Sequence, residues 1–248
     1  MDDSFLKLLL HVHNNNPQEG PGSEKSTLKA LSYAKDLPTN PKILDIGCGP
    51  GRHTITLAKE TKGQITAIDI FDQYLKAVKN HAQKEQLENI KVINCPMENI
   101  DKLNDTYDLI WSEGAIYFMG FEKGLNSWKE FLNPKGYIAV TNISWLKENP
   151  PEELNQFWQE NFPAINTIED KIKIIKKINL QLINHFTLPK SDWLQYHDFL
   201  QKRMNYLKEN ESDNKELMEY IKNEEAEIEM YNKYSDYYGY EFFIIQKP

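Results

Sequence analysis

Hydrophobic residues gather in seven short runs along the chain, and longer segments of mixed polarity separate most of them. Short apolar-rich runs bounded by turn-forming residues predict buried strands, whereas apolar residues three and four positions apart predict helices. We therefore predict strands over residues 43–46, 64–70, 90–94, 107–112, 137–142, 180–188 and 239–245. Helical segments alternate with the first five strands, and this alternation predicts an α/β protein with parallel strands and right-handed crossovers.

The rest of the chain is predicted to be mostly helical. Apolar spacing predicts an N-terminal helix over 5–12, a helix that begins after Ser23, and later helices over 151–161, 167–177, 191–207 and 215–231. The last two helices are too long for a simple hairpin, so we interpret them as an insertion. We expect one domain over residues 1–248, made of an N-terminal helical segment (1–40), a core (41–145), a largely helical part (146–236) and a final strand (237–248).

Composition excludes few function classes but favours a cytoplasmic protein. The chain has 248 residues, a formal net charge of −8 and a pI near 5.4, without the basic footprint typical of nucleic-acid binding. Its two cysteines, Cys48 and Cys95, have neither metal-ligand spacing nor a disulfide pattern. The acidic start does not resemble a signal peptide, and no apolar run approaches the roughly 20 residues that span a bilayer. We therefore expect no membrane, nucleic-acid or metal partner.

The first strand leads into the most informative stretch, Asp45-x-Gly47-x-Gly49-x-Gly51, which precedes a helix over 52–62. Glycines between a strand and a helix let a ligand approach bare backbone, and the helix end offers unpaired N–H groups. The dinucleotide fingerprint G-x-G-x-x-G would require glycine at position 52, where this chain has arginine. The loop therefore predicts a nucleotide-like cofactor and disfavours NAD.

Asp69 ends the second predicted strand, 18 residues beyond Gly51. This spacing is close to the roughly 20 residues at which an acid meets ribose hydroxyls in doubly wound nucleotide sites. The alternative is that Asp69 caps the following helix. We favour the ribose role because the glycine loop precedes it.

The glycine loop, Asp69 and the Asn133-Pro134-Lys135-Gly136 turn before the fifth strand together resemble the class I S-adenosylmethionine-dependent methyltransferases. The resemblance implies a Rossmann-like, seven-stranded, mostly parallel sheet with helices on both faces and an antiparallel last strand. It also implies that the insertion covers the substrate side. In such a protein Asp45, Gly47, Cys48 and Gly49 would contact the methionine part of the cofactor. Asp69 would bind ribose, and Ile70, Met97 and Glu98 would lie around adenine.

Glu113 follows the fourth strand and faces the predicted reaction site, so it is our candidate for a general base, a cofactor contact or a substrate-holding residue. Four aromatic residues are candidates for an acceptor pocket, although packing in the core is the stronger default for aromatics at helical spacing: Tyr117, Trp145, Trp193 and Tyr196. Residues 13–27, and Gly20 to Thr27 within them, either form a lid over the cofactor or a surface connector.

These observations predict a methyltransferase that moves a methyl group from S-adenosylmethionine to a small-molecule acceptor and releases S-adenosylhomocysteine. The acidic net charge and the inserted cover favour a small molecule over nucleic acid. A cofactor-binding protein without turnover is the main alternative, and an NAD-dependent enzyme is a weaker one. We expect a monomer or a homodimer.

Overall fold

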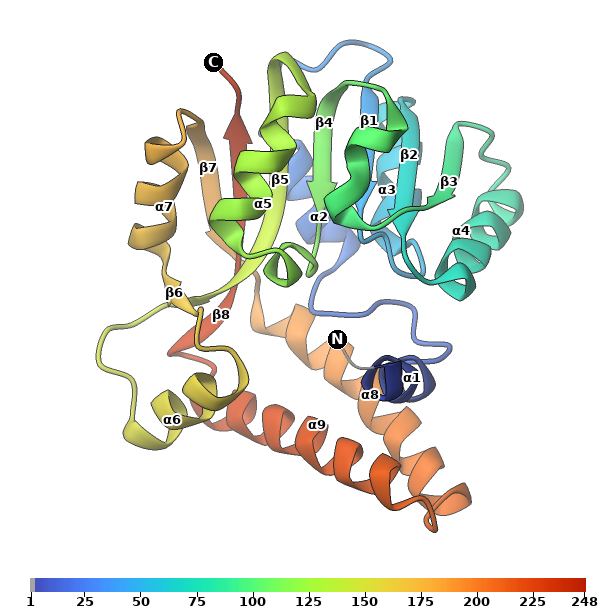
Figure 1. Cartoon of the computed structure of the whole chain (residues 1–248), viewed down its shortest axis with the longest axis vertical. Coiled ribbons are helices and arrows are strands. Elements are labelled where there is room, and N and C mark those ends of the chain that lie inside the picture. Colours follow the sequence, from blue (N-terminus) through green and yellow to red (C-terminus); the bar gives the residue numbers. More distant parts are fainter. Residues whose placement is uncertain (1–2) are drawn as a thin grey trace.

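The seven predicted strands form, and they join one sheet in the order β3-β2-β1-β4-β5-β8-β7 (Figure 1). The computed structural model describes residues 3–248, so the first two residues of the acidic start lie outside the described residues. A short eighth strand, which the sequence pattern did not predict, pairs with β5. The strands are β1 (Lys42–Ile46), β2 (Gln64–Asp69), β3 (Ile90–Asn94), β4 (Tyr107–Ser112), β5 (Leu132–Trp145), β6 (Asn166–Thr167), β7 (Gln181–Thr187) and β8 (Tyr238–Gln246).

Strand directions confirm the predicted fold class. β1 pairs in parallel with β2 and β4, and β4 pairs in parallel with β5. β8 lies between β5 and β7 and is antiparallel to both. The carboxyl ends of β1, β2 and β4 therefore meet at one edge of the sheet, where open α/β sheets bind their ligands.

Helices cover both faces of the sheet. The α-helices are α1 (Asp3–Val12), α2 (Glu24–Leu31), α3 (Arg52–Thr61), α4 (Asp72–Lys84), α5 (Phe121–Trp128), α6 (Glu152–Asn161), α7 (Ile168–Lys177), α8 (Lys190–Asn210) and α9 (Lys215–Tyr234). Short 3-10 helices are η1 (Met97–Leu103), η2 (Ile116–Phe118) and η3 (Lys129–Phe131). α5 and α7 pack on one face of the sheet, whereas α2, α3 and α4 pack on the other.

The alternation of side chains along each strand explains this layering. In β1, Leu44 and Ile46 are fully buried against the α5 side, whereas Ile43 is fully buried against α2 and α3. Trp128 at the end of α5 is also fully buried. Complete burial of a large apolar side chain contributes about 1.5–3 kcal/mol, so both faces of β1 stabilise the sheet.

The two long helices of the insertion, α8 and α9, lie with α1 below the carboxyl edge of the parallel strands (Figure 1). Their contacts form a separate apolar cluster that includes Val12 of α1, Met204 of α8 and Ile221 of α9, all fully buried. Among residues 3–248, no helix combines the length and apolarity that a membrane crossing requires.

Candidate active site

The loop between β1 and α3 has a backbone shape that glycine allows. Gly47 and Gly51 have φ angles of +69° and +92°, in the left-handed region. A Cβ on Gly47 would lie 2.5 Å from Cβ of Ala115, and one on Gly51 would lie 2.7 Å from Cγ2 of Val78. A side chain at either position would therefore meet a neighbour, and the loop presents backbone at the carboxyl edge of the sheet, with Gly47 half-buried and Gly49 and Gly51 buried.

Asp69 joins this loop to the end of β2. Its Oδ2 accepts a hydrogen bond from the N–H of Gly49 at 3.0 Å, and its Oδ1 accepts one from the N–H of Phe71 at 3.0 Å. Burial raises the pKa of Asp69 to about 6, although both N–H groups oppose this rise. Each oxygen retains a further lone pair, so a fixed and half-buried carboxylate can still accept hydrogen bonds from a ligand.

The predicted neighbours of adenine lie beside Asp69. Ile70 is exposed although it is apolar, with 45% of its surface accessible. The ends of β2 and β3 are tied together, because the N–H of Cys95 donates to the carbonyl of Asp69 at 3.1 Å. Met97 follows two residues later, half-buried against the core, and Glu98 is exposed. An apolar surface therefore borders the Asp69 carboxylate, as a purine with an attached ribose requires.

Glu113 is held on both oxygens at the end of β4. Its Oε1 accepts hydrogen bonds from Thr27 Oγ1 at 2.7 Å and from Trp111 Nε1 at 2.9 Å. Its Oε2 pairs with Nη2 of Arg52 at 2.9 Å. Burial acts to raise the pKa of Glu113, but the Arg52 guanidinium, His53 and the two hydrogen bonds outweigh it, so the pKa is lowered. Glu113 is therefore an anion with little tendency to take up a proton.

Arg52 is a further candidate site residue, which the sequence interpretation used only to show that the third glycine of the dinucleotide fingerprint is missing. It is the first residue of α3 and its side chain is 19% exposed. Nε and Nη1 of Arg52 are buried and have no hydrogen-bond partner among residues 3–248. Buried N–H groups without partners are costly, so these two donors fit an anionic group of a ligand. In the sequence, the signal for this role is a positively charged residue directly after the glycine loop.

The carboxylate of Asp45 forms its hydrogen bonds with other side chains of the protein core. It is fully buried, and its oxygens contact His53 Nε2 at 3.0 Å and Thr54 Oγ1 at 2.5 Å. Burial acts to lower the pKa of His53, but the charges of Asp45 and Glu113 and the hydrogen bond with Asp45 together outweigh it, so the pKa is raised. Cys48 is also buried, and burial raises the pKa of its thiol well above the usual value. Asp45 thus fixes the start of α3 beneath the loop.

The N-terminal segment 13–27 lies over the glycine loop. A Cβ on Gly49 would be 3.4 Å from Cγ of Glu19, and one on Gly22 would be 2.6 Å from Nη2 of Arg52. His13 Nδ1 lies 2.9 Å from Glu19 Oε2. This segment is therefore positioned where the predicted lid would be.

The four predicted pocket aromatics separate into two groups. Burial raises the pKa of both Tyr117 and Tyr196, and the charges of Glu19 and of two carboxylates of α9 raise them further, so the two phenols lie near the same charges. Trp193, by contrast, is 2% exposed and stacks on Tyr231 with ring centroids 4.2 Å apart. Trp145 packs against the same apolar cluster as Trp193.

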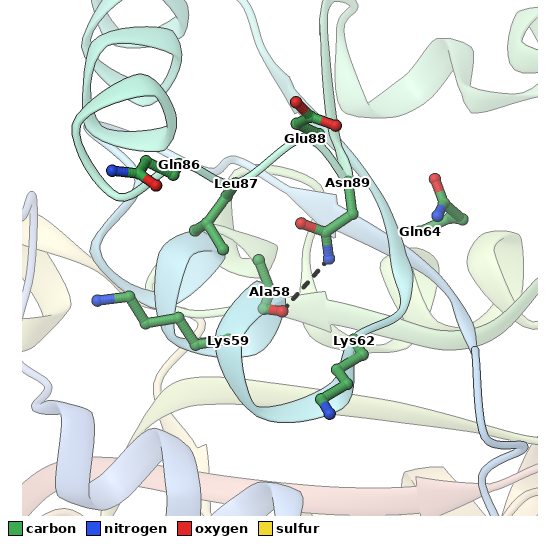
Figure 2. Close-up of a pocket in the computed structure, with 8 residues that line it drawn as sticks. All are labelled: Ala58, Lys59, Lys62, Gln64, Gln86, Leu87, Glu88 and Asn89. Atoms are coloured by element: carbon green, nitrogen blue, oxygen red, sulfur yellow. Dashed lines mark hydrogen bonds between the residues drawn. The ribbon is translucent and has the colours of Figure 1, made fainter.

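A different hollow lies at the opposite edge of the sheet. Figure 2 shows this surface pocket of about 640 Å³, bordered by residues of α3, the start of β2 and the turn before β3. Gln64 is the first residue of β2, and Asn89, which donates to the carbonyl of Ala58 at 3.3 Å, directly precedes β3. The pocket therefore adjoins the amino ends of strands and shares no lining residue with the candidate site.

Comparison with known proteins identifies the fold and the family. A family model described as a methyltransferase domain matches residues 38–234. The chain belongs to this family. The predicted methyltransferase is thereby confirmed.

Relatives and solved structures agree with this assignment. The methyltransferase is 31% identical over 144 residues to a Methanobrevibacter smithii protein named "Probable cobalt-precorrin-6B C(15)-methyltransferase (decarboxylating)", an alignment that covers 57% of this chain and 74% of the relative. It is 24% identical over 214 residues to (S)-coclaurine N-methyltransferase of Thalictrum flavum, covering 80% of this chain and 59% of the relative. A Geobacter sulfurreducens methyltransferase crystallised with S-adenosylhomocysteine has the same fold, with a TM-score of 0.83 and 17% identity over 98% of each chain.

The structure of this methyltransferase brings most of the predicted site residues to one edge of the sheet. Gly49, Asp69 and Glu113 are linked there, directly or through Arg52 and the N-terminal segment, and Gly47 lies in the same loop as Gly49. Trp193 lies in the apolar cluster below. Groups of three or more His, Cys, Asp or Glu side chains able to hold a metal ion are absent from residues 3–248.

Proposed function

We propose that this protein transfers a methyl group from S-adenosylmethionine to a small-molecule acceptor. The observation that carries this proposal is the meeting of a bare glycine loop, the fixed Asp69 carboxylate and the unpartnered N–H groups of Arg52 at one sheet edge. The solved neighbours with S-adenosylhomocysteine support the same cofactor.

The residues present fit each part of this cofactor. Asp69 would accept hydrogen bonds from the ribose hydroxyls, with adenine between Ile70 and Met97 and near Glu98. The loop residues Gly47, Cys48 and Gly49, fixed from below by Asp45, would lie along the methionine part. Arg52 would pair with its carboxylate. When bound, the cofactor supplies a methyl group on a sulfonium, which is a good leaving group and needs mainly alignment with the acceptor.

Glu113 acts in this proposal as a positioning residue. A general base works best with a pKa near the operating pH, whereas the pKa of Glu113 is lowered below its usual acidic value. Its bonds to Arg52 and Thr27 instead fix the carboxylate-binding group and the N-terminal segment.

The acceptor side lies between the sheet edge and the helices of residues 146–236. The names of relatives, such as coclaurine N-methyltransferase, support a small acceptor. Residues 13–27 would act as a lid that opens for exchange of the cofactor. A cytoplasmic location, the four-part division of the chain and a monomer or homodimer stay predictions from sequence.

A thermal-shift series tests the cofactor. Ligand at 100 times its dissociation constant stabilises a protein by about 2.7 kcal/mol, which for a chain of this size corresponds to a rise in Tm of about 5–10 °C. We expect this rise with S-adenosylmethionine and S-adenosylhomocysteine, its loss in Asp69→Ala, and its retention in the exposed control Asp213→Ala. A rise with NAD alone would favour the NAD-dependent alternative, and binding without turnover of any acceptor would favour a non-catalytic protein.

A further inference from the structure

The inward face of α9 carries two carboxylates. Tyr220, Glu224, Glu227 and Tyr231 follow one another at spacings of four, three and four residues, so they form one stripe along the helix. Both tyrosines of this stripe are buried, at 9% and 3% exposure, and the glutamates between them are half-buried. Glu229, two residues further along from Glu227, is exposed on another side of the helix. The glutamates of the stripe therefore lie on the side of α9 that carries its buried tyrosines.

Tyrosines from three other elements surround these carboxylates. The charge of Glu227 acts on Tyr117 of η2, on Tyr196 of α8 and on Tyr240 of β8. Burial raises the pKa of each of these phenols, and the charge of Glu227 raises it further. Tyr240 also stacks on Trp193 with ring centroids 5.3 Å apart, so its ring is fixed. The two carboxylates of α9 and the aromatic rings of η2, α8 and β8 therefore come together in one region, which lies in the space between these elements.

The negative charge in this space lacks a matching cation. Neither Glu224 nor Glu227 takes part in an ion pair among the residues that the structure describes. Glu225, which lies between them in sequence, pairs with Lys208 instead. The charge of His13 acts to lower the pKa of Glu227. The ring of His13, however, lies 2.9 Å from the carboxylate of Glu19, which is its direct partner. Burial and the adjacent Glu224 raise the pKa of Glu227 to about 7.

A second, independent feature points to a ligand in the same space. Tyr238 is fully buried, and its hydroxyl has no hydrogen-bond partner within residues 3–248. Glu227 is the carboxylate whose charge acts most strongly on this phenol. A buried hydroxyl without a partner costs stability, so a polar ligand group between Tyr238 and Glu227 would satisfy both.

This space adjoins the position proposed for the methionine end of the cofactor. Tyr117 lies four residues after Glu113, and the charge of Glu19, whose side chain covers Gly49, acts on both Tyr117 and Tyr196. An acceptor seated here would therefore lie next to the transferable methyl group.

We propose that the acceptor is a small molecule with a basic amine, and that its ammonium group binds between Glu224 and Glu227 inside the ring of tyrosines. This proposal rests on the methyltransferase function proposed above. Two carboxylates attract an ammonium and repel a carboxylate or phosphate, and tyrosine faces stabilise a cation through their quadrupoles. Glu224 already has a hydrogen bond with Tyr220, and a neutral hydroxyl would bring no positive charge to either carboxylate.

The same residues provide the proton transfer that the reaction needs. An ammonium has no lone pair, so it first gives a proton to the carboxylate of Glu227. The nitrogen lone pair then forms the new N–C bond while the S–C bond breaks, and sulfur keeps the electron pair of that bond. The products are S-adenosylhomocysteine and a methylated ammonium, whose charge again lies beside Glu224.

Calorimetric titration of the protein saturated with S-adenosylhomocysteine tests this proposal without turnover. The probes are matched pairs of amine and alcohol on one carbon skeleton, from methylamine and methanol up to phenethylamine and 2-phenylethanol. We expect at least one amine to bind ten times more tightly than its alcohol. The preference should fall below twofold in Glu227→Gln and in the double variant Glu224→Gln/Glu227→Gln, and it should remain in Glu229→Gln.

The outcomes of this titration separate a failure of the amine proposal from a failure of the proposed function. Equal binding of amine and alcohol, a preference that survives in the double variant, or no binding by any amine of the series would overturn the amine proposal while cofactor binding stands. Failure of S-adenosylhomocysteine itself to bind would instead refute the proposed function. For an amine that turns over, we expect kcat of Glu227→Gln to fall at least 100-fold and its pH profile to lose the limb near pH 7.

Discussion

Replacement of Glu113 by glutamine tests how the site is held together. Glu113 is 9% exposed and accepts from Thr27, Trp111 and Arg52. Glutamine keeps the size and one acceptor oxygen, but it removes the charge that faces Arg52. Arg52 already has two buried N–H groups without partners, so the variant leaves its guanidinium with no anion within this site. Loss of one partner from a buried ion pair costs about 3–5 kcal/mol.

We therefore expect Glu113→Gln to lower the free energy of unfolding by about 3 kcal/mol at pH 7, at the low end of that range because two hydrogen bonds can persist. Urea unfolding followed by tryptophan fluorescence measures it, and Trp111 reports directly on the site. Thr27→Val is the matched control, because it removes one hydrogen bond to the same oxygen and should cost about 1 kcal/mol. A loss in Glu113→Gln no larger than in the control would show that the ion pair between Glu113 and Arg52 does not stabilise the fold.

The pH dependence supplies a second check on Glu113. Its pKa is lowered in the folded protein, so its stabilising contribution is complete above the unfolded value of about 4.3 and is lost as pH falls through the lower folded value. The difference in unfolding free energy between wild type and Glu113→Gln should therefore be constant from pH 7 to about 5 and shrink below pH 4. A difference that grows toward acid would contradict the lowered pKa.

Three further predictions address the loop, the buried lysine and the cofactor. Gly51→Ala should lower the free energy of unfolding by about 3 kcal/mol, because it adds left-handed backbone strain and a close contact with Val78. Gly114, at φ +71°, has no neighbour within 4 Å of an added Cβ, so Gly114→Ala should lower it by only about 1 kcal/mol. Urea unfolding measures both values. Lys171 is 1% exposed, and burial lowers its pKa to about 7. The free energy of unfolding of wild type should therefore rise relative to that of Lys171→Met as pH rises from 7 toward 10. A difference between the two proteins that does not change with pH would contradict this. Arg52→Met should weaken S-adenosylhomocysteine binding about 10- to 100-fold and leave adenosine binding unchanged, because adenosine lacks the carboxylate; an equal loss for both ligands, measured by calorimetry, would place the carboxylate elsewhere.

Local sequence patterns predicted the parts of the fold that local physics decides. The strands and the glycine loop follow from apolar runs and from backbone shapes that glycine permits, and Ser23 caps α2 as expected, since its side chain accepts from the N–H of Ser26. The fifth strand is longer than predicted. It begins at Leu132 because the Asn133–Gly136 turn remains within the strand, with Lys135 at φ +62°.

Contacts between segments distant in sequence determine the features of the site that local sequence patterns did not predict. The pairing of Arg52 with Glu113 joins residues 61 positions apart, and no spacing rule reaches that far. The charged stretch in the middle of α9 has the pattern of a solvated helix face, yet Glu224 and Glu227 lie on the side of the buried tyrosines. Their direction depends on where α1 and α8 pack, and so on contacts between segments distant in sequence.

In the proposed function, a methyl-donor cofactor binds between the glycine loop and Asp69. A crystal structure of the protein with S-adenosylhomocysteine tests this binding mode. We expect both ribose hydroxyls within hydrogen-bond distance of Asp69, the adenine against Ile70 and Met97, and the methionine carboxylate on Arg52. A ligand bound at another edge of the sheet, or one whose ribose does not contact Asp69, would contradict the account.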